Sequence, residues 1–351
     1  MANEQIPSPI LRREQSDVQR VVWLDVLRVI ATFGVILLHV GGTDFHLPVG
    51  EHNWYIAVVF DSLVRWSVPI FVMISGALFL KPEKNITIKT LLTKYVQRLL
   101  VVYLFWWLAY SCFDVAIASM SAKMLVFKEG FLKPHFHLWF LPMLMGVYLL
   151  IPVLRKVASD AMLLKYALTL WLVYLTISFL LVREVPQISH LFAMNCIVGY
   201  AGYFLLGFFL ATTSLKKKQR QAICALGLTG ALITVMGSII LSFHRGMDDE
   251  MFLSNISPQV VMMATALFVL VKDIAPKVED HVKRVVNYVR KDLFGIYLVH
   301  GIWLFLLNRA LFRNVTNHLV TLPLITLAIF VGSLYTTKLL RLLSGFKRFV
   351  E

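Results

Sequence analysis

Long apolar segments alternate with short polar ones along the whole chain. An α-helix rises 1.5 Å per residue, so about 20 apolar residues are needed to cross the hydrocarbon core of a bilayer. Runs of about this length occupy residues 21–42, 56–80, 96–120, 137–154, 163–182, 196–213, 222–243, 258–275, 293–312 and 320–343. None shows the two-residue alternation of a membrane-spanning strand. The pattern therefore predicts an all-α fold, a polytopic membrane bundle of about ten transmembrane helices.

The connections between these runs leave no room for a soluble domain, because none exceeds about 20 residues. We expect a single membrane domain over residues 21–343, between cytoplasmic tails at 1–20 and 344–351. The start of the chain lacks an apolar stretch close to the first Met, so the first run is expected to be a retained span. The segment 275–292 carries Val278, Val282, Val285 and Val289 at helical spacing and is expected to form a helix at the membrane surface.

Composition and charge support a membrane protein and give its orientation. Hydrophobic residues make up 58% of the chain and charged residues 15%, and the mean hydropathy is +0.74. Roughly 25 of the 34 Lys and Arg residues lie on one set of alternate connections and roughly 7 on the other. The positive-inside rule then places both termini in the cytoplasm. Orientation also accounts for the formal net charge of +14, so no nucleic-acid partner is expected.

No metal centre or disulfide framework is expected. The three cysteines, Cys112, Cys196 and Cys224, lie singly in apolar stretches without metal-type spacing. Histidines in the connections, such as His46, His135, His244 and His318, do not form a metal-binding pattern. Chemistry must then come from polar side chains within the helices.

The first apolar run, WLDVLRVIATFGVILLHV, places three ionisable residues on one helical face. At 100° per residue, Arg28 and His39 differ in direction by about 20°, and Asp25 and His39 by about 40°. Arg28 and His39 are about 16 Å apart along the helix, with Arg28 near the cytoplasmic surface. Charges at such depth are costly and usually functional. The competing interpretation is an interfacial Asp25–Arg28 ion pair and a hydrogen-bonded core histidine.

Four motifs in order resemble a known family. Arg28 and His39 form an R-x10-H pair in a first span that begins WLDVLR, and SVPIFVMISGALF follows in the second span. HLWFL at 137–141 and GIYLVH at 295–300 come later. Together they resemble the acyltransferase-3 family of integral membrane O-acyltransferases, of the bacterial cell-surface glycan O-acetyltransferase type. The resemblance runs from about residue 21 to about 343.

The resemblance implies a multi-pass enzyme of the bacterial cytoplasmic (inner) membrane. Its donor is expected to be cytoplasmic acyl-CoA, usually acetyl-CoA, and its acceptor a hydroxyl of a cell-envelope glycan or glycolipid. His39 is expected to act as general base or as transient acyl carrier, two possibilities that the sequence does not separate. Arg28, with Asp25, is expected to hold the donor. Ser75 and Gly76 match the SG pair of the family in the second span. Ser75 is assigned to the donor site, although small-residue helix packing is the favoured explanation of the pair.

Arg65 lies in the second apolar run at a depth near that of His39. It is a candidate to stabilise the oxyanion of the transferred group, the alternative being a counter-ion for Asp61 one turn earlier. His137 and Trp139 open the fourth span and are candidates to line the acceptor entrance, or to form an interfacial aromatic belt.

Tyr297 and His300 lie three residues apart in the ninth span and share a face. They are supporting candidates at the acceptor site, and a buried, hydrogen-bonded histidine is an equally good interpretation of His300.

The rival function is a transporter or flippase of a lipid-linked or small solute. Such proteins commonly carry intramembrane carboxylates for ion coupling. Here Asp25 and Asp61 each lie three or four residues from an arginine, and only Asp114 stands alone in a span. The pattern favours an enzyme.

Overall fold

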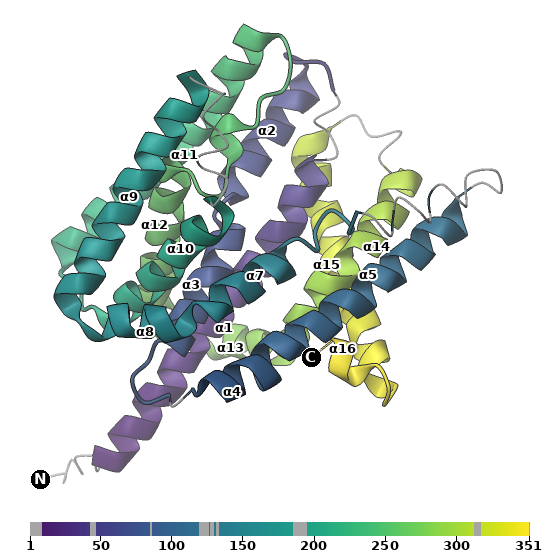
Figure 1. Ribbon diagram of the computed structural model, residues 1–351. Helices are drawn as coiled ribbons and strands as arrows, with labels where there is room; N and C mark the ends of the chain where they lie inside the picture. The colour runs from purple at the N-terminus through teal and green to yellow at the C-terminus, as the bar shows by residue number, and fades with distance from the viewer. Residues whose placement is uncertain are drawn as a thin grey trace, which may run out of the picture.

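The computed structural model describes residues 9–42, 47–84, 86–118, 126, 130, 133–184, 195–311 and 317–350. These residues form helices and turns, with no β-strand among them (Figure 1). The α-helices are α1 (Pro9–Gly42), α2 (His52–Val64), α3 (Ser67–Phe79), α4 (Ile88–Thr90), α5 (Gln97–Ile117), α7 (Phe140–Leu149), α8 (Ile151–Ser159), α9 (Ala161–Glu184), α10 (Asn195–Thr212), α11 (Lys217–Arg245), α12 (Pro258–Ile274), α13 (Asp280–Val289), α14 (Leu293–Leu311), α15 (His318–Leu342) and α16 (Lys347–Val350). A π-helical segment, Leu91–Val96, leads into α5, and short 3-10 helices occupy Met251–Leu253 and Ala275–Lys277.

The helices confirm the all-α, polytopic membrane fold. In the described parts of the chain, seven helical segments are long and apolar enough to cross a bilayer, or eight if the bent pair α7–α8 counts as one span. The shorter apolar helices Ile197–Thr212 and Leu293–Leu307 lie where two further spans are expected. The count of ten and the cytoplasmic location of the termini stay predictions.

Helix α1 is the central element of the bundle. It runs without a break for 34 residues and begins at Pro9, well before the expected apolar start at residue 21. In Figure 1, α1, α2 and α3 lie between the α9–α12 group and the group formed by α5, α14 and α15. Helix α1 contacts α2, α3, α14 and α15 directly. Residues on its different faces therefore meet both flanks of the molecule.

The second span is two helices rather than one. Helix α2 ends at Val64 and α3 begins at Ser67, whose hydroxyl donates to the carbonyl of Val64 over 2.6 Å. Pro69 has no N–H to donate to the carbonyl of Arg65, so a continuous helix loses a hydrogen bond at this point. Arg65 consequently lies at a helix break, not inside a regular helix as its position in the apolar run predicted.

The expected fourth span is also interrupted. Helices α7 and α8 are bent by 57° at Leu150, and Pro152 stands in the first turn of α8. Proline is tolerated in a first helical turn because its missing N–H has no intrahelical partner there. The bend leaves α7 as a short helix whose N-terminal end follows the turn 136–139.

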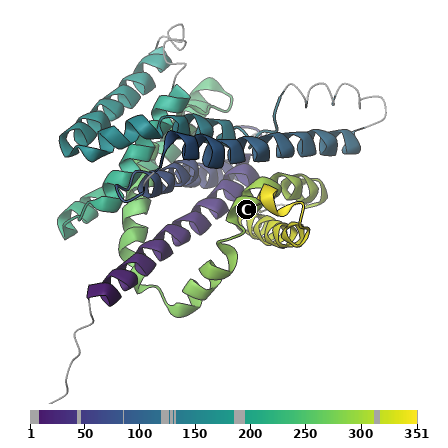
Figure 2. The same ribbon diagram turned by 60° about the horizontal axis from the view of Figure 1, so that its bottom comes forward.

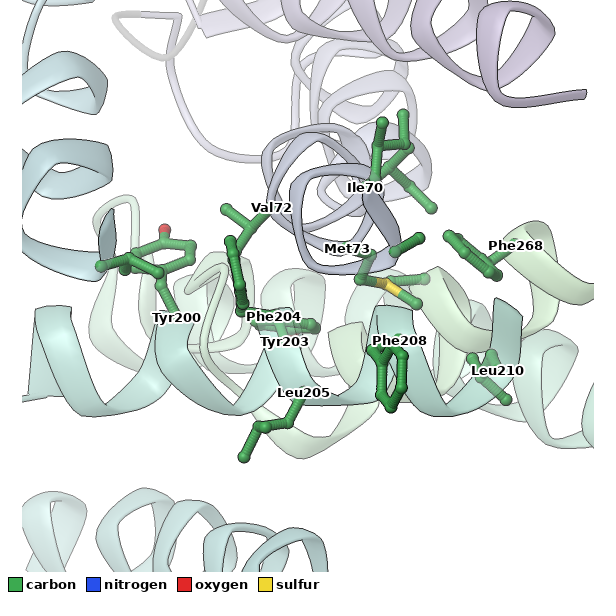
Figure 3. Packing of buried hydrophobic residues seen from close by; sticks show 14 of the residues in the cluster. Ile70, Val72, Met73, Tyr200, Tyr203, Phe204, Leu205, Phe208, Leu210 and Phe268 are labelled. Atoms are coloured by element: carbon green, nitrogen blue, oxygen red, sulfur yellow. The ribbon is translucent and has the colours of Figure 1, made fainter. Parts of the chain in front are cut away.

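The largest apolar core joins α3 to α10 and α12. Figure 3 shows α3 nearly end-on across α10, with Ile70 and Met73 above Phe204 and Phe208. The helices approach closely because glycines face the partner backbone. A Cβ on Gly76 would lie 1.8 Å from the carbonyl oxygen of Phe204. Gly76 is therefore a packing residue, as the small-residue interpretation of the SG pair predicted.

A helix is present in the segment where a surface helix is expected: α13, drawn in light green in Figure 2, which contacts α1. Its location at the membrane surface stays a prediction. Its buried valines are Val286 and Val289, whereas Val285 is 59% exposed, so the apolar face is rotated from the one expected. The C-terminal segment also folds back: Val350 is fully buried, and the Trp106 indole donates to the carbonyl of Phe349 over 2.9 Å.

Candidate active site

A cavity of about 670 Å³ extends along α1. Its wall includes seven residues singled out from the sequence: Arg28 and His39 of α1, Arg65 and Ser75 of the second span, and His137, Trp139 and Tyr297 from the α7 and α14 regions. Residues from distant parts of the chain thus face one space. Arg28 and His39 both line it and lie about 16 Å apart along a straight helix, and we call the Arg28 side and the His39 side of this space its two ends.

At the Arg28 end, charged side chains form a small network. Arg28 donates to the carboxylate of Asp25 over 2.6 Å, and Arg290 approaches the same carboxylate to 3.6 Å. Asp25 is buried, whereas the Arg28 side chain is 34% exposed. Asp25 therefore does not line the cavity but holds two arginines that do. The interfacial ion pair and the donor-binding interpretation both fit this geometry.

At the other end, imidazole rings gather around His39. The rings of His39 and His300 stack, with centroids 5.3 Å apart and planes 20° apart. His137 meets His300 edge-on at 4.7 Å, and Phe136 meets His39 edge-on at 4.8 Å. His300 is completely buried and does not line the cavity itself. The structure brings His39, His137 and His300 together from α1, the turn before α7, and α14.

The hydrogen bond of His300 fixes which ring nitrogen carries its proton. Its Nδ1 lies 2.5 Å from the carbonyl oxygen of Tyr297, and a carbonyl only accepts, so Nδ1 is the donor. A neutral His300 then has its lone pair on Nε2, which is buried without a hydrogen-bond partner among the described residues. His300 is thus the hydrogen-bonded histidine that the sequence allowed, and also a base next to His39.

Tyr297 secures the neighbouring turn. Its hydroxyl donates to the carbonyl of His137 over 2.6 Å, which fixes the turn before α7 to α14. His135 also belongs to this cluster, with its Nδ1 3.1 Å from Nδ1 of His137 and its ring stacked on Tyr110. Burial lowers the pKa of His135 to about 4, so it is neutral at pH 7. The sequence placed His135 in a connection and missed its role.

Arg65 enters the cavity from the break between α2 and α3. Its Nε donates to Oδ2 of Asp61 over 2.9 Å, and Nη2 donates to the same oxygen. Asp61 is fully buried, and Arg65 is 14% exposed. The counter-ion interpretation is therefore confirmed, but it does not remove Arg65 from the site, because the ion pair holds the guanidinium in the cavity wall.

Ser75 and Trp139 complete the predicted set. The Ser75 hydroxyl lines the cavity and donates to the Phe71 carbonyl over 3.0 Å, a bond within α3. The Trp139 ring lies 6.0 Å from that of Tyr200 of α10, so it lines the cavity while packing against the core. A donor-binding role for Ser75 stays a prediction.

Sequence reasoning missed several cavity residues. Arg98, Arg290 and Lys291 were assigned only to the orientation of the chain, and Asn255 was not considered. Their common signal is weak, since each lies in or beside a connection and reaches the cavity only through the fold. Within the described residues, no group of three or more His, Cys, Asp or Glu side chains has an arrangement that could hold a metal ion.

The geometry combines a cationic opening with a buried imidazole cluster, which suits an anionic substrate whose reactive group must reach a base. A family model described as "Acyltransferase domain" matches residues 21–338. The chain belongs to the acyltransferase-3 family. No curated protein and no solved structure matches it. The chain is thus a multi-pass membrane acyltransferase, and membership favours this over a transporter or flippase.

Proposed function

We propose that this acyltransferase-3 protein transfers an acetyl group from cytoplasmic acetyl-CoA to a hydroxyl of a cell-envelope saccharide outside the bacterial cytoplasmic membrane. One observation carries the proposal: a single cavity has Arg28 in its wall at one end and His39 with Arg65 at the other. Such a cavity lets a donor that enters from one side meet an acceptor that enters from the other.

The donor fits the cavity in charge and in length. Coenzyme A has a polyanionic head and a long pantetheine arm, of a length comparable to the 16 Å or so between Arg28 and His39. Arg28 binds the head or upper arm, with its guanidinium steadied by Asp25. Ser75 lines the same cavity and contacts the arm.

The chemical step uses His39 and Arg65. His39 takes the proton of the acceptor hydroxyl as its oxygen attacks the thioester carbonyl, and Arg65 stabilises the oxyanion that forms. The C–S bond then breaks, and the leaving thiolate takes the proton from His39. In the alternative sequence, His39 itself attacks and carries the acyl group as an acyl-imidazole before the acceptor arrives.

The acceptor approaches from the side of the turn before α7. His137 and Trp139 line the cavity there, and Tyr297 fixes this turn through its bond to the His137 carbonyl. His300 supports the site from behind, through its stacking on His39. An aromatic wall of this kind suits the apolar face of a sugar ring.

Release of free coenzyme A from acetyl-CoA tests the proposal. Purified protein in lipid nanodiscs is given acetyl-CoA with and without an envelope glycan extract, and the glycan is analysed for new ester. We expect release that depends on the glycan, and ester formation in equal amount. A protein that moves glycan lipids across vesicle membranes without releasing coenzyme A would instead be a flippase.

A further inference from the structure

The cytoplasmic end of the cavity carries more positive charge than Arg28 alone. Arg98 from the start of α5, and Arg290 and Lys291 from the connection between α13 and α14, also line it. We call Arg28, Arg98, Arg290 and Lys291 the cationic rim. Three separate parts of the chain contribute to it, so the fold gathers these charges from segments that are distant in sequence.

The rim retains a net positive charge. The cavity wall contains no Asp or Glu among the described residues, and Asp25, behind the wall, pairs with Arg28 and Arg290. Four cations and one carboxylate leave a net charge of about +3 near neutral pH. Within the part of the chain that the structure describes, no ion pair joins Arg98 or Lys291 to a carboxylate.

Lys84, in the connection after α3, lies close enough to Arg28 of the rim for the two charges to interact. Burial lowers its pKa, and Lys81, Lys94, Arg155 and Arg28 lower it further. Arg155 has a structural explanation, since it donates to the carbonyls of Phe79 and Lys81 and so ends α3. Arg98 and Lys291 make no such bonds to carbonyls in the described structure, which leaves their donors available.

We propose that the cationic rim is a binding subsite for the phosphate groups of the donor, with Arg98 and Lys291 recognising the 3′-phosphate of the nucleotide. This inference rests on the proposed function. A phosphomonoester carries nearly two negative charges at neutral pH, and a diphosphate adds two more, so coenzyme A matches the charge of the rim. Arg28 and Arg290, oriented by Asp25, bind the diphosphate nearer the pantetheine arm. Arg98 and Lys291, which pair with no carboxylate among the described residues, bind the terminal phosphate dianion.

Donors of decreasing phosphate content test the subsite. Acetyl-CoA carries both groups, acetyl-dephospho-CoA lacks only the 3′-phosphate, and acetyl-pantetheine lacks every phosphate. The variant is Arg98→Gln with Lys291→Gln. The matched control is Lys277→Gln with Arg284→Gln, which removes the same two charge types from residues outside the cavity wall. Transfer by each protein is measured as kcat/KM for each donor.

We expect the rim variant to lose at least about tenfold in kcat/KM with acetyl-CoA, and little with the other two donors. The control should resemble the parent with all three donors. Raised salt should reduce the preference of the parent for acetyl-CoA over acetyl-dephospho-CoA, because exposed charges are screened. An equal loss with all three donors would show that Arg98 and Lys291 support the fold or the chemistry instead, and would overturn the subsite.

Direct binding separates this inference from the proposed function. Calorimetric titration of parent and rim variant with coenzyme A and with dephospho-CoA requires no acyl transfer. A tenfold preference for coenzyme A that disappears in the rim variant supports the subsite even if no acceptor is acylated. Equal binding of both nucleotides by the parent overturns the subsite even if transfer is observed.

Discussion

The two ends of the cavity are built from the same kinds of residue but in opposite environments. Each has an Asp–Arg pair within one helical turn. Both carboxylates are buried, but the Arg28 side chain at the rim is 34% exposed, whereas that of Arg65 is 14% exposed. The rim adds exposed cations, and the inner end adds buried imidazoles. There His300 donates from Nδ1 to the carbonyl of Tyr297, and the Tyr297 hydroxyl donates to the backbone carbonyl of His137. The difference indicates that the rim is suited to attract and bind an anion, whereas the inner end holds its side chains in fixed positions relative to one another.

His39→Ala has the largest expected effect and tests whether the two ends of the cavity have different roles. If His39 is the base, kcat falls by roughly 10²–10⁴-fold, while the undamaged rim still binds donor. The measurement is activity per mole of monodisperse protein that binds coenzyme A. A merely structural histidine would give an alanine variant whose remaining folded fraction transfers acyl groups at the parental rate.

The two ion pairs should respond very differently to loss of the carboxylate. Asp61→Asn leaves the Arg65 guanidinium, which is only 14% exposed, without its partner, and we expect a loss of roughly 3–5 kcal/mol in the free energy of unfolding. Asp25→Asn should cost only about 1 kcal/mol, because water still reaches Arg28. Unfolding in mixed micelles, followed by denaturant titration, gives both values. Equal losses in the free energy of unfolding would mean that water reaches Arg28 no more than it reaches Arg65.

Arg28→Ala should act on binding rather than on chemistry. We expect the donor KM to rise by about tenfold or more with a nearly unchanged kcat, because the contact is made equally in the ground and transition states. The fold should survive, since Asp25 keeps Arg290 as a partner. Calorimetry with coenzyme A provides the check. Unchanged donor affinity would reduce Arg28 to a structural ion-pair residue.

The assignment of the rim to the cytoplasm is tested without any effect on activity. A cysteine at Lys217 should not react with a membrane-impermeant reagent in intact cells, whereas a cysteine in the 183–195 connection should. Only permeabilised cells should label the Lys217 position. Labelling of that position in intact cells would reverse the orientation and place the rim on the outside.

Much of the fold could be predicted because its signal is local. Apolar runs of sufficient length locate most of the long helices within a few residues, as for α12 at Pro258–Ile274 against an expected 258–275. The breaks after Val64 and at Leu150 were missed, although Pro69 and Pro152 stand beside them. Hydropathy shows which segments are apolar enough to lie in the membrane. It does not show where the helix within such a segment breaks or bends.

The residues of the candidate site also divide into those that the sequence could identify and those that it could not. His39 and Arg28 could be identified because they share one helix, where spacing alone fixes their relation. His135 could not, because its contact with His137 depends on how Tyr297 of another helix holds the turn. Lys291 was hidden by a different effect, since a basic residue beside a span is expected from orientation alone.

Because α1 is unbroken, the number of residues between Arg28 and His39 fixes both the distance and the angle between them. Both residues lie on one helix that has no proline or other interruption between them. One inserted residue would rotate His39 by about 100° from its present direction, and four would bring it back to within about 40° of that direction but some 6 Å too far from Arg28. Under the proposed function, this spacing sets the length of the donor that fits between the two side chains. The number of residues between them should then be far less tolerant of change than their identities.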